Sequence, residues 1–203
     1  MRFRSINEMI QFRAERSSSL VAMLYRDSGR WRERNWGDVY GRAALIAAGL
    51  RAVGVGAGER VCIYSHTRPE WTLCDYGILG ARAVSVPISP SIHLREFEYI
   101  LDSVEARVVF VEDVNQLDRL AAIHHKKAAG QLWVIMSGTA PDEDGVLSLA
   151  DLMARGRDGK DVIFAESIDS SAPDDVATIL FSSYGSDAES LPKGVTLTHA
   201  NIL

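Results

Sequence analysis

The stretch VCIYSHTRPEWTLCDYGILGARAVSVPI, residues 61–88, decides the fold class, because two apolar segments in it enclose one helical pattern. Residues 61–64 and 83–88 are short, apolar and rich in β-branched side chains without polar alternation, which is typical of strands covered on both faces. Between them, Pro69 suits the first turn of a helix that runs towards Gly80. Strand, helix and strand in this order predict a right-handed βαβ unit with parallel strands.

Segments of the same two kinds continue on both sides of this stretch. Apolar residues at helical spacing predict three more helices, at 39–53, 97–104 and 115–125. Apolar runs predict three more strands, at 107–111, 132–136 and 176–181. Asn35 is placed to cap the first of these helices. Before it, two strand-like segments at 20–25 and 31–36, with a turn at 27–29, predict a β-hairpin.

The predicted fold class is therefore α/β, with a largely parallel, doubly wound sheet, flanking helices and an N-terminal β-hairpin. We divide the chain into an N-terminal helix and hairpin (1–36) and a βαβ core (37–136). A stretch rich in Gly, Asp and Ser (137–175) is predicted to be a surface excursion with one short helical patch at 147–154. Residues 176–203 are expected to form a core strand, a phosphate-loop-like segment and the start of the next helix.

Composition narrows the classes of partner. The chain has 203 residues, 47% of them hydrophobic and 24% charged, with a net charge of -5. This acidic balance argues against nucleic acid or an anionic membrane as the main partner, although it leaves room for a local basic patch. No apolar run has the length of a membrane span or a signal peptide, so we expect a cytoplasmic protein. Cys62 and Cys74 are expected to be reduced core thiols.

Two apparent motifs carry no chemistry. The glycines at 54, 56 and 58 follow a predicted helix and precede a strand, whereas a dinucleotide site needs the glycines between a strand and the following helix. We interpret them as a helix end and a turn. The five histidines form no spacing typical of a metal site, so we assign no metal ligand.

The segment FSSYGSDAESLPKGVTLTH, residues 181–199, is the chemically informative one. A buried strand leads into a loop of hydroxyl-bearing residues and glycine, followed by Pro-Lys-Gly. Hydroxyls and backbone N–H groups at the end of a parallel strand can hold a triphosphate, and a lysine supplies compensating charge. The alternative is a solvent-exposed polar hairpin. The candidate phosphate-binding residues are Ser182, Ser183, Gly185, Ser186, Lys193 and Gly194.

These residues resemble a known family, the adenylate-forming (AMP-binding) enzymes, and within it most closely the bacterial long-chain fatty acyl-CoA synthetases. The family's phosphate loop reads Tyr-Thr-Ser-Gly-Thr-Thr-Gly-x-Pro-Lys-Gly-Val and is followed by Leu-Thr-His, which residues 191–199 match closely. Residues 45–60, 68–71 and 80–88 are also similar to the family, so the likeness extends from Ser19 onward. The resemblance implies an incomplete N-terminal domain of the adenylate-forming fold.

The resemblance also implies a reaction. The family is an ATP-dependent acid–thiol ligase that activates a fatty acid as acyl-AMP and transfers it to coenzyme A, with ATP, Mg²⁺ and CoA as cofactors. The candidate residues above would contact the ATP phosphates, and Thr198 and His199 would lie near the substrate. No catalytic residue is assigned to this chain, because the family's magnesium glutamate, ribose-binding aspartate and adenylation lysine lie beyond the matching region.

Two departures from the family lead us to expect that this chain alone is inactive. Ser183 and Lys193 are ten positions apart, against seven in the family, and the longer loop contains Asp187 and Glu189. Carboxylates near a triphosphate repel it, so our hypothesis is that ATP binding is weakened or lost. The alternatives are a non-catalytic binding or regulatory module, a component of a split enzyme, and an unrelated nucleotide-binding protein, which residues 191–199 disfavour. We also expect self-association, or association with a missing C-terminal half.

Overall fold

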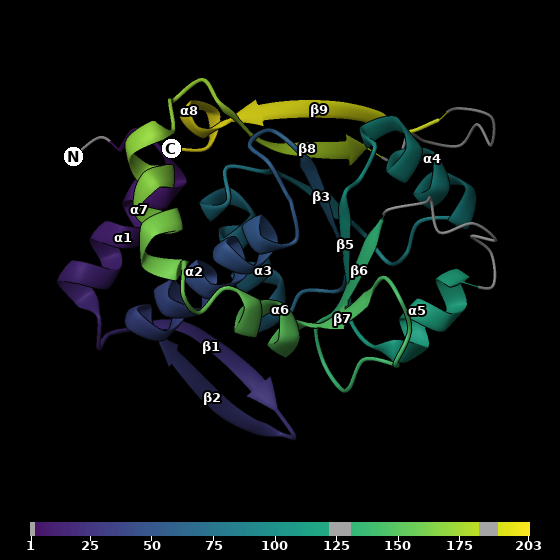
Figure 1. The fold of residues 1–203 in the computed structure, drawn as a ribbon, viewed down its shortest axis with the longest axis horizontal. Helices are drawn as coiled ribbons and strands as arrows, with labels where there is room; N and C mark the ends of the chain where they lie inside the picture. Colours follow the sequence, from purple (N-terminus) through teal and green to yellow (C-terminus); the bar gives the residue numbers. More distant parts are fainter. Residues whose placement is uncertain (1–2, 122–130, 183–190) are drawn as a thin grey trace.

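The computed structural model describes residues 3–121, 131–182 and 191–203 (Figure 1). Its helices are α1 (Ile6–Ser17), α2 (Trp36–Ala52), α3 (Pro69–Gly80), α4 (Leu94–Val104), α5 (Val114–Ala121), α6 (Leu149–Arg155), α7 (Lys160–Ser170) and α8 (His199–Ile202). Its strands are β1 (Val21–Asp27), β2 (Arg30–Asn35), β3 (Arg60–Tyr64), β4 (Val84–Ile88), β5 (Val108–Val111), β6 (Leu132–Ile135), β7 (Val146–Ser148), β8 (Val176–Ser182) and β9 (Lys193–Thr198).

The main sheet has seven strands in the order β7-β6-β5-β3-β4-β8-β9. Every neighbouring pair is parallel except β8–β9, which is antiparallel. The chain passes from β3 to β4 on one side and then crosses to β5 on the other side of β3, so the order reverses between β3 and β5. The predicted α/β class, with a largely parallel and doubly wound sheet, is confirmed.

Helices cover both faces of this sheet, which explains why the strand segments lack polar alternation. Successive side chains of a strand point to opposite faces. In β3, Val61 and Ile63 accordingly join a core formed with α2, α3, α6 and α7. Cys62 and Tyr64 join a second core formed with α4 and α5. Figure 1 shows these two groups of helices on opposite sides of the sheet.

The predicted hairpin is present as β1 and β2, which form a separate two-stranded sheet. Ser28 and Gly29 connect the strands with φ values of 48° and 80°, so both turn residues are left-handed, as a two-residue hairpin turn requires. The chain then enters α2 at once, where the side chain of Asn35 accepts a hydrogen bond from the backbone N–H of Asp38 at 2.8 Å. The predicted cap is therefore confirmed.

Residues 137–175, predicted to be a surface excursion, differ from that prediction. They contain β7, which extends the parallel sheet, and the helices α6 and α7, which pack on α2. Leu152 and Phe164 from these helices are completely buried. The helical patch predicted at 147–154 corresponds to α6. Helix α7 and strand β7 were not predicted, because polar turns between the short elements gave the segment its hydrophilic composition.

Helices α2 and α6 approach so closely that glycine is required at the contact. A Cβ atom built on Gly49 would lie 2.2 Å from the carbonyl oxygen of Leu152. A Cβ atom on Gly156, directly after α6, would lie 2.2 Å from the carbonyl oxygen of Leu45. Both distances are far below van der Waals contact, so only the hydrogen atoms of glycine fit between the two backbones.

Helix α1 is fixed to distant parts of the chain by buried polar contacts. The Asn7 side chain donates to the carbonyl oxygen of Leu79 at 2.8 Å and to the Ser167 hydroxyl at 3.3 Å. The backbone N–H of Ile6 donates to Nδ1 of His199 at 3.3 Å. The first helix is therefore part of the main body of the protein, beside the last helix (Figure 1).

Two further expectations have partial outcomes. The helix predicted at 115–125 corresponds to α5, which is described as far as Ala121; residues 122–125 lie outside the described residues. Strand β9 was not predicted as a strand. In the described part of the chain, no helix combines the length and apolar character needed to cross a membrane.

Candidate functional site

The β8–β9 pair brings part of the predicted phosphate segment together. Ser182 and Lys193 are directly opposite each other in the antiparallel register, and the Ser182 hydroxyl donates to the Lys193 carbonyl oxygen at 3.5 Å. Gly194 is opposite Phe181, where an added Cβ would lie 3.1 Å from the aromatic ring. Gly194 is thus explained by the close approach of the two strands. Ser183, Gly185 and Ser186 lie outside the described residues.

Ser182 lies at the carboxyl end of β8, and because β8 runs parallel to β4, it shares an edge of the sheet with the carboxyl ends of β4, β3, β5 and β6. In open α/β sheets this edge is where ligands bind, at the point where the strand order reverses. Here the reversal falls between β3 and β5. The carboxyl edge is therefore the candidate functional site.

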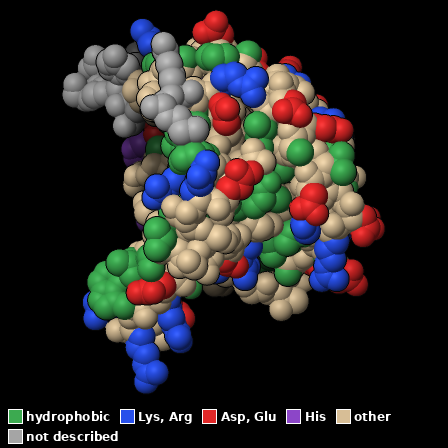
Figure 2. Space-filling view, turned by 90° about the vertical axis from the view of Figure 1, so that its left-hand side faces the viewer, with side chains coloured by type: hydrophobic (Ala, Val, Ile, Leu, Met, Phe, Trp, Pro, Cys, Tyr) green, Lys and Arg blue, Asp and Glu red, His purple; other side chains and the backbone are tan. Residues whose placement is uncertain are grey.

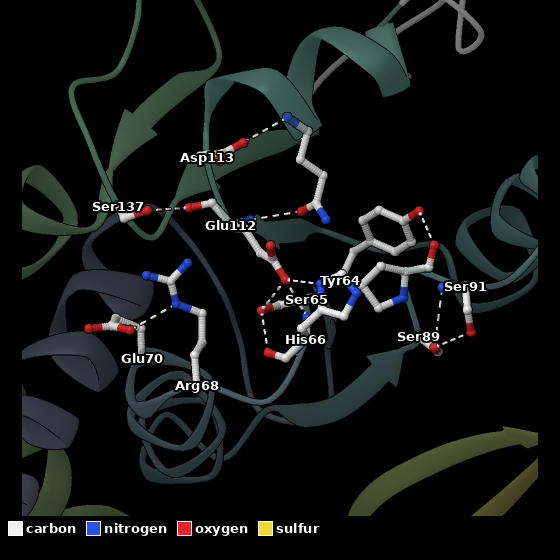
Figure 3. A network of polar contacts seen from close by, with 12 residues as sticks. Tyr64, Ser65, His66, Arg68, Glu70, Ser89, Ser91, Glu112, Asp113 and Ser137 are labelled. Carbon is white, nitrogen blue, oxygen red and sulfur yellow. Dashed lines mark hydrogen bonds and ion pairs between the residues drawn. The ribbon is translucent and has the colours of Figure 1, made fainter. Parts of the chain in front are cut away.

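Glu112, directly after β5, is the centre of a polar network at this reversal point (Figure 3). Its carboxylate accepts hydrogen bonds from the Ser65 hydroxyl at 3.2 Å and from the backbone N–H of His66, both directly after β3. Nδ1 of His66 lies 2.8 Å from the same oxygen. Ser137, after β6, donates its hydroxyl to the Glu112 carbonyl oxygen at 2.9 Å. The ends of three strands are thereby joined through one residue.

The electrostatics of Glu112 follow from these contacts. Partial burial alone would raise the pKa of its carboxyl, but the donors from His66 and Ser65 outweigh burial and hold the pKa below its ordinary value. Glu112 is therefore ionised at neutral pH. The imidazole of His66 remains largely exposed, and its contact with Glu112 holds it at the carboxyl edge of the sheet.

Other polar groups extend the network along the edge. After β4, the hydroxyls of Ser89 and Ser91 are 2.8 Å apart, and the Tyr64 hydroxyl donates to the carbonyl oxygen of Pro90 at 3.2 Å. These contacts tie the loop after β4 to the end of β3 (Figure 3). The edge therefore presents hydroxyls, an imidazole and a carboxylate from four neighbouring loops.

Thr198 and His199, predicted to lie near the substrate, are at the opposite end of β9 from Lys193. Thr198 caps the short helix α8, where its side chain accepts a hydrogen bond from the Asn201 N–H at 3.3 Å. His199 is buried, and its Nδ1 is the acceptor for the Ile6 N–H. Burial lowers the pKa of His199, and nearby Asp175 opposes the shift only in part. The imidazole of His199 is therefore neutral and has a structural role.

A cavity of about 470 Å³ lies at this opposite, amino edge of the sheet. His199, Thr196 and Val176 line it from the C-terminal side, and Arg82 and Asp175, 3.6 Å apart, supply its charged groups. It is separated from Ser182 and Lys193 by the length of β9. The cavity is therefore not a continuation of the phosphate-binding candidates.

The sequence predicted one strand end of the candidate site and missed the others. Ser65, His66, Glu112 and Ser137 were not singled out, although each follows an apolar run that was correctly predicted as a strand. The available signal was their position, since polar residues directly after parallel strands meet at one edge. Among the described residues, no group of three or more His, Cys, Asp or Glu side chains is arranged to hold a metal ion.

Comparison with known proteins identifies a family that matches nearly the whole chain. The family described as AMP-binding enzyme matches residues 10–203. A long-chain-fatty-acid–CoA ligase, FadD15 of Mycobacterium bovis, is 28% identical over 175 residues, covering 86% of this chain and 28% of the relative. Probable acyl-activating enzyme 16 of Arabidopsis thaliana is 31% identical over 168 residues, covering 76% of this chain and 23% of the relative.

Solved structures agree in fold. The crystal structure of the anthranilate CoA ligase AuaEII in complex with anthranoyl-AMP has a TM-score of 0.79 at 21% identity, covering 97% of this chain and 35% of that chain. The fatty acid AMP ligase from Legionella pneumophila has a TM-score of 0.72 at 18% identity, covering 98% of this chain and 31% of that chain. This chain thus spans about a quarter of the length of the curated relatives named above.

Proposed function

The chain belongs to the AMP-binding enzyme family, and from that membership we propose that it forms part of an ATP-dependent acid–thiol ligase. The proposed reaction activates a carboxylic acid as its acyl-adenylate and passes it to coenzyme A. We propose a long-chain fatty acid as the substrate, since relatives in Mycobacterium bovis and Xenopus laevis carry the name long-chain-fatty-acid–CoA ligase. The part represented by this chain is the N-terminal portion of the AMP-binding domain.

One observation carries the assignment of a nucleotide-binding role. Ser182 and Lys193 face each other at the carboxyl edge, where the two strands that flank the phosphate segment pair. A hydroxyl and an ammonium group at the end of a parallel strand suit a triphosphate, because a charge-assisted hydrogen bond is about twice as strong as a neutral one. The described residues offer no cluster of carboxylates for magnesium, so we assign no metal ligand and expect magnesium to enter with the triphosphate.

We further propose that residues 1–203 alone bind ATP weakly and do not complete the reaction. Asp187 and Glu189 add two negative charges between Ser182 and Lys193. Charges of like sign near a triphosphate repel it. The chain also corresponds to less than a third of the length of its curated relatives, which leaves most of their sequence unmatched.

Those two acidic residues also favour the second candidate, a binding or regulatory module, or a component of a split enzyme, that keeps the fold without catalysis. Neutralising them separates the candidates. If they only weaken a nucleotide site, Asp187→Asn with Glu189→Gln should tighten the binding of MgATP. If the segment has lost nucleotide binding altogether, the double variant should leave the affinity unchanged.

Calorimetric titration with MgATP tests the proposal. We expect weak binding by the natural chain, and Lys193→Ala should reduce the affinity of the neutralised variant by about tenfold or more, as for loss of a charged hydrogen bond. Lys160→Ala is the matched control, because Lys160 is paired with Asp161 on the surface of α7. Micromolar affinity of the natural chain would contradict the weakening, and equal effects of the two lysine variants would contradict the assigned site.

An activity assay tests the second half of the proposal. Thioester formation from palmitate, ATP and coenzyme A should be undetectable for residues 1–203 alone. Turnover by the isolated chain would show that the activity needs nothing beyond these residues.

A further inference from the structure

A cavity of about 300 Å³ lies between α1, α3, β8 and the end of α8, apart from the cavity at the amino edge. Helix α3 contributes Trp71, Asp75 and Leu79, which follow one another at intervals of four residues and therefore share one face of the helix. A volume of this size is at the lower end of the range for small-molecule sites. Apolar side chains from the other elements complete the walls, among them Ile6, Met9, Leu180 and Leu203.

Among the described residues that line this cavity, Asp75 is the one with an acidic or basic side chain. The Ser85 hydroxyl donates to its Oδ1 atom at 2.5 Å. In the described part of the chain, no Lys, Arg or His side chain forms an ion pair with Asp75. A carboxylate has two oxygens that can each accept more than one hydrogen bond, so the described residues leave much of its bonding capacity unused.

An unpaired carboxylate in apolar surroundings is costly, because the charge loses water and gains no counter-ion. Burial accordingly raises the pKa of Asp75, and the donor from Ser85 opposes this shift only in part. The contact with Ser85 does not by itself explain an aspartate, since an asparagine could accept the same bond without a charge. The group that would compensate Asp75 is a cation with N–H donors.

Two aromatic side chains beside Asp75 favour the same kind of ligand. Trp71 and Tyr76 both line the cavity from α3. Aromatic ring faces attract cations within about 6 Å, and the indole of tryptophan does so best. Apolar walls with one carboxylate and two aromatic rings therefore suit a ligand with an apolar stem and one cationic head.

We propose that this cavity binds a primary ammonium group on a short aliphatic chain, with the ammonium at Asp75 and the chain against Leu79 and Leu180. The volume of about 300 Å³ equals that of roughly ten water molecules in the liquid, which is room for hexylammonium. A lysine side chain of a peptide has the same chemistry as a free alkylamine. The two sources are therefore compared in the test.

This site is separate from the proposed nucleotide site. Ser182, Lys193 and Gly194 do not line the cavity. Amine binding is therefore measured without ATP, and loss of nucleotide binding leaves this inference untouched. Conversely, failure of amine binding says nothing against the proposed ligase.

Calorimetric titration of the whole chain at pH 8 compares hexylamine with 1-hexanol, a neutral ligand of the same length. Hexylamine is protonated at this pH, since its pKa resembles the value of about 10.4 for lysine. We expect hexylammonium to bind about tenfold or more tightly than hexanol, as for gain of a charged hydrogen bond. Asp75→Asn, which can still accept from Ser85, should abolish this difference by weakening the binding of hexylammonium alone.

Two further variants separate the charge from the apolar wall. Leu180→Ser, at a 42% exposed position of the cavity wall, should weaken both ligands by a similar factor and so preserve their difference. Asp27→Asn is the matched control and should change neither affinity, because Asp27 is exposed on the β1–β2 hairpin, the lowest projection in Figure 2. Nα-acetyl-lysine methylamide is the peptide-like probe: if it binds more tightly than hexylammonium, the ammonium group comes from a lysine side chain.

Three results would overturn the inference. The first is equal affinity of the natural chain for hexylammonium and hexanol, or no binding of either at millimolar concentration. The second is an Asp75→Asn variant that binds hexylammonium as tightly as the natural chain does. The third is a dimer in sedimentation velocity that Leu180→Ser dissociates, because a second copy would then cover the cavity.

Discussion

Replacing Gly49 with alanine should separate α2 from α6 and destabilise the protein. The added Cβ would lie 2.2 Å from the Leu152 carbonyl oxygen and 2.9 Å from its carbonyl carbon, where ordinary contact begins at 3.4 Å. The obstacle is backbone, so no side chain can rotate away to make room. The helices must therefore move apart by about 1.2 Å at this point, the difference between 3.4 Å and 2.2 Å.

Two effects of opposite sign set the magnitude. Alanine is favoured over glycine inside a helix by about 1 kcal/mol. Overpacking a close contact costs about 3 kcal/mol at the upper end of its usual range, because buried neighbours such as Leu152 lose contacts when the helices separate. The net effect of Gly49→Ala should therefore be a loss of about 2 kcal/mol in the free energy of unfolding.

The same helix provides the control. An added Cβ at Gly41, also in α2, meets no atom within 4 Å, so Gly41→Ala should gain about 1 kcal/mol from helix propensity alone. Urea denaturation of both variants, followed by far-ultraviolet circular dichroism, measures the difference. If Gly49→Ala unfolds at the same or a higher urea concentration than the natural chain, the steric reasoning is wrong.

Three other predictions concern buried groups and the hairpin turn. Burial lowers the pKa of His199 in the folded state, so below about pH 6.5 the unfolded chain binds more protons than the folded one. The free energy of unfolding should therefore decrease as the pH is lowered, by up to about 1.4 kcal/mol per pH unit. This fall, measured by urea denaturation, should be smaller in His199→Asn, whose side-chain oxygen can still accept from Ile6, and an equal fall would contradict the assignment. Ser85→Ala removes the hydroxyl that donates to the Asp75 carboxyl at 2.5 Å, so it should cost about 1–3 kcal/mol. Burial already raises the pKa of Asp75, so the loss should be larger at pH 7 than at pH 4; a pH-independent loss would argue against an ionised Asp75. Gly29→Ala places a Cβ at φ 80° with open space around it, so thermal unfolding should show a loss of about 1–2 kcal/mol, and no loss would mean that the turn relaxes.

The fold was predictable because its strands are continuous apolar runs. Residues 61–64 and 83–88 lie in a sheet that is covered on both faces. Strands in this environment are apolar throughout, and such runs can be recognised in the sequence alone. Residues 137–175 could not be assigned in the same way. Leu152 and Phe164 bring α6 and α7 into the core, but polar turns surround each short helix and dilute the signal.

The candidate site was predictable only where its residues are consecutive in sequence. Lys193 and Gly194 fall in a recognisable motif that follows the strand predicted at 176–181, and the structure places them at the start of β9, opposite the end of that strand. Ser65, His66 and Glu112 come together only through the strand order, in which β3 and β5 are adjacent although β4 lies between them in sequence. Hydrophobic periodicity reports which face of a strand is buried, but it does not report which strands are neighbours.

The contacts of α1 have a consequence for the timing of synthesis. Ser167 is synthesised 160 residues after its partner Asn7, and His199 is synthesised 193 residues after its partner Ile6. Translation proceeds at roughly 5–20 residues per second, so helix α1 waits on the order of ten seconds or more for the groups that hold it. During that interval α1 can pack on α2 and α3, but its core with Ala177 of β8 is incomplete. Until α7 and α8 are complete, the polar groups of Ile6 and Asn7 lack these partners, so α1 is open to chaperones and proteases for longer than α2 or α3.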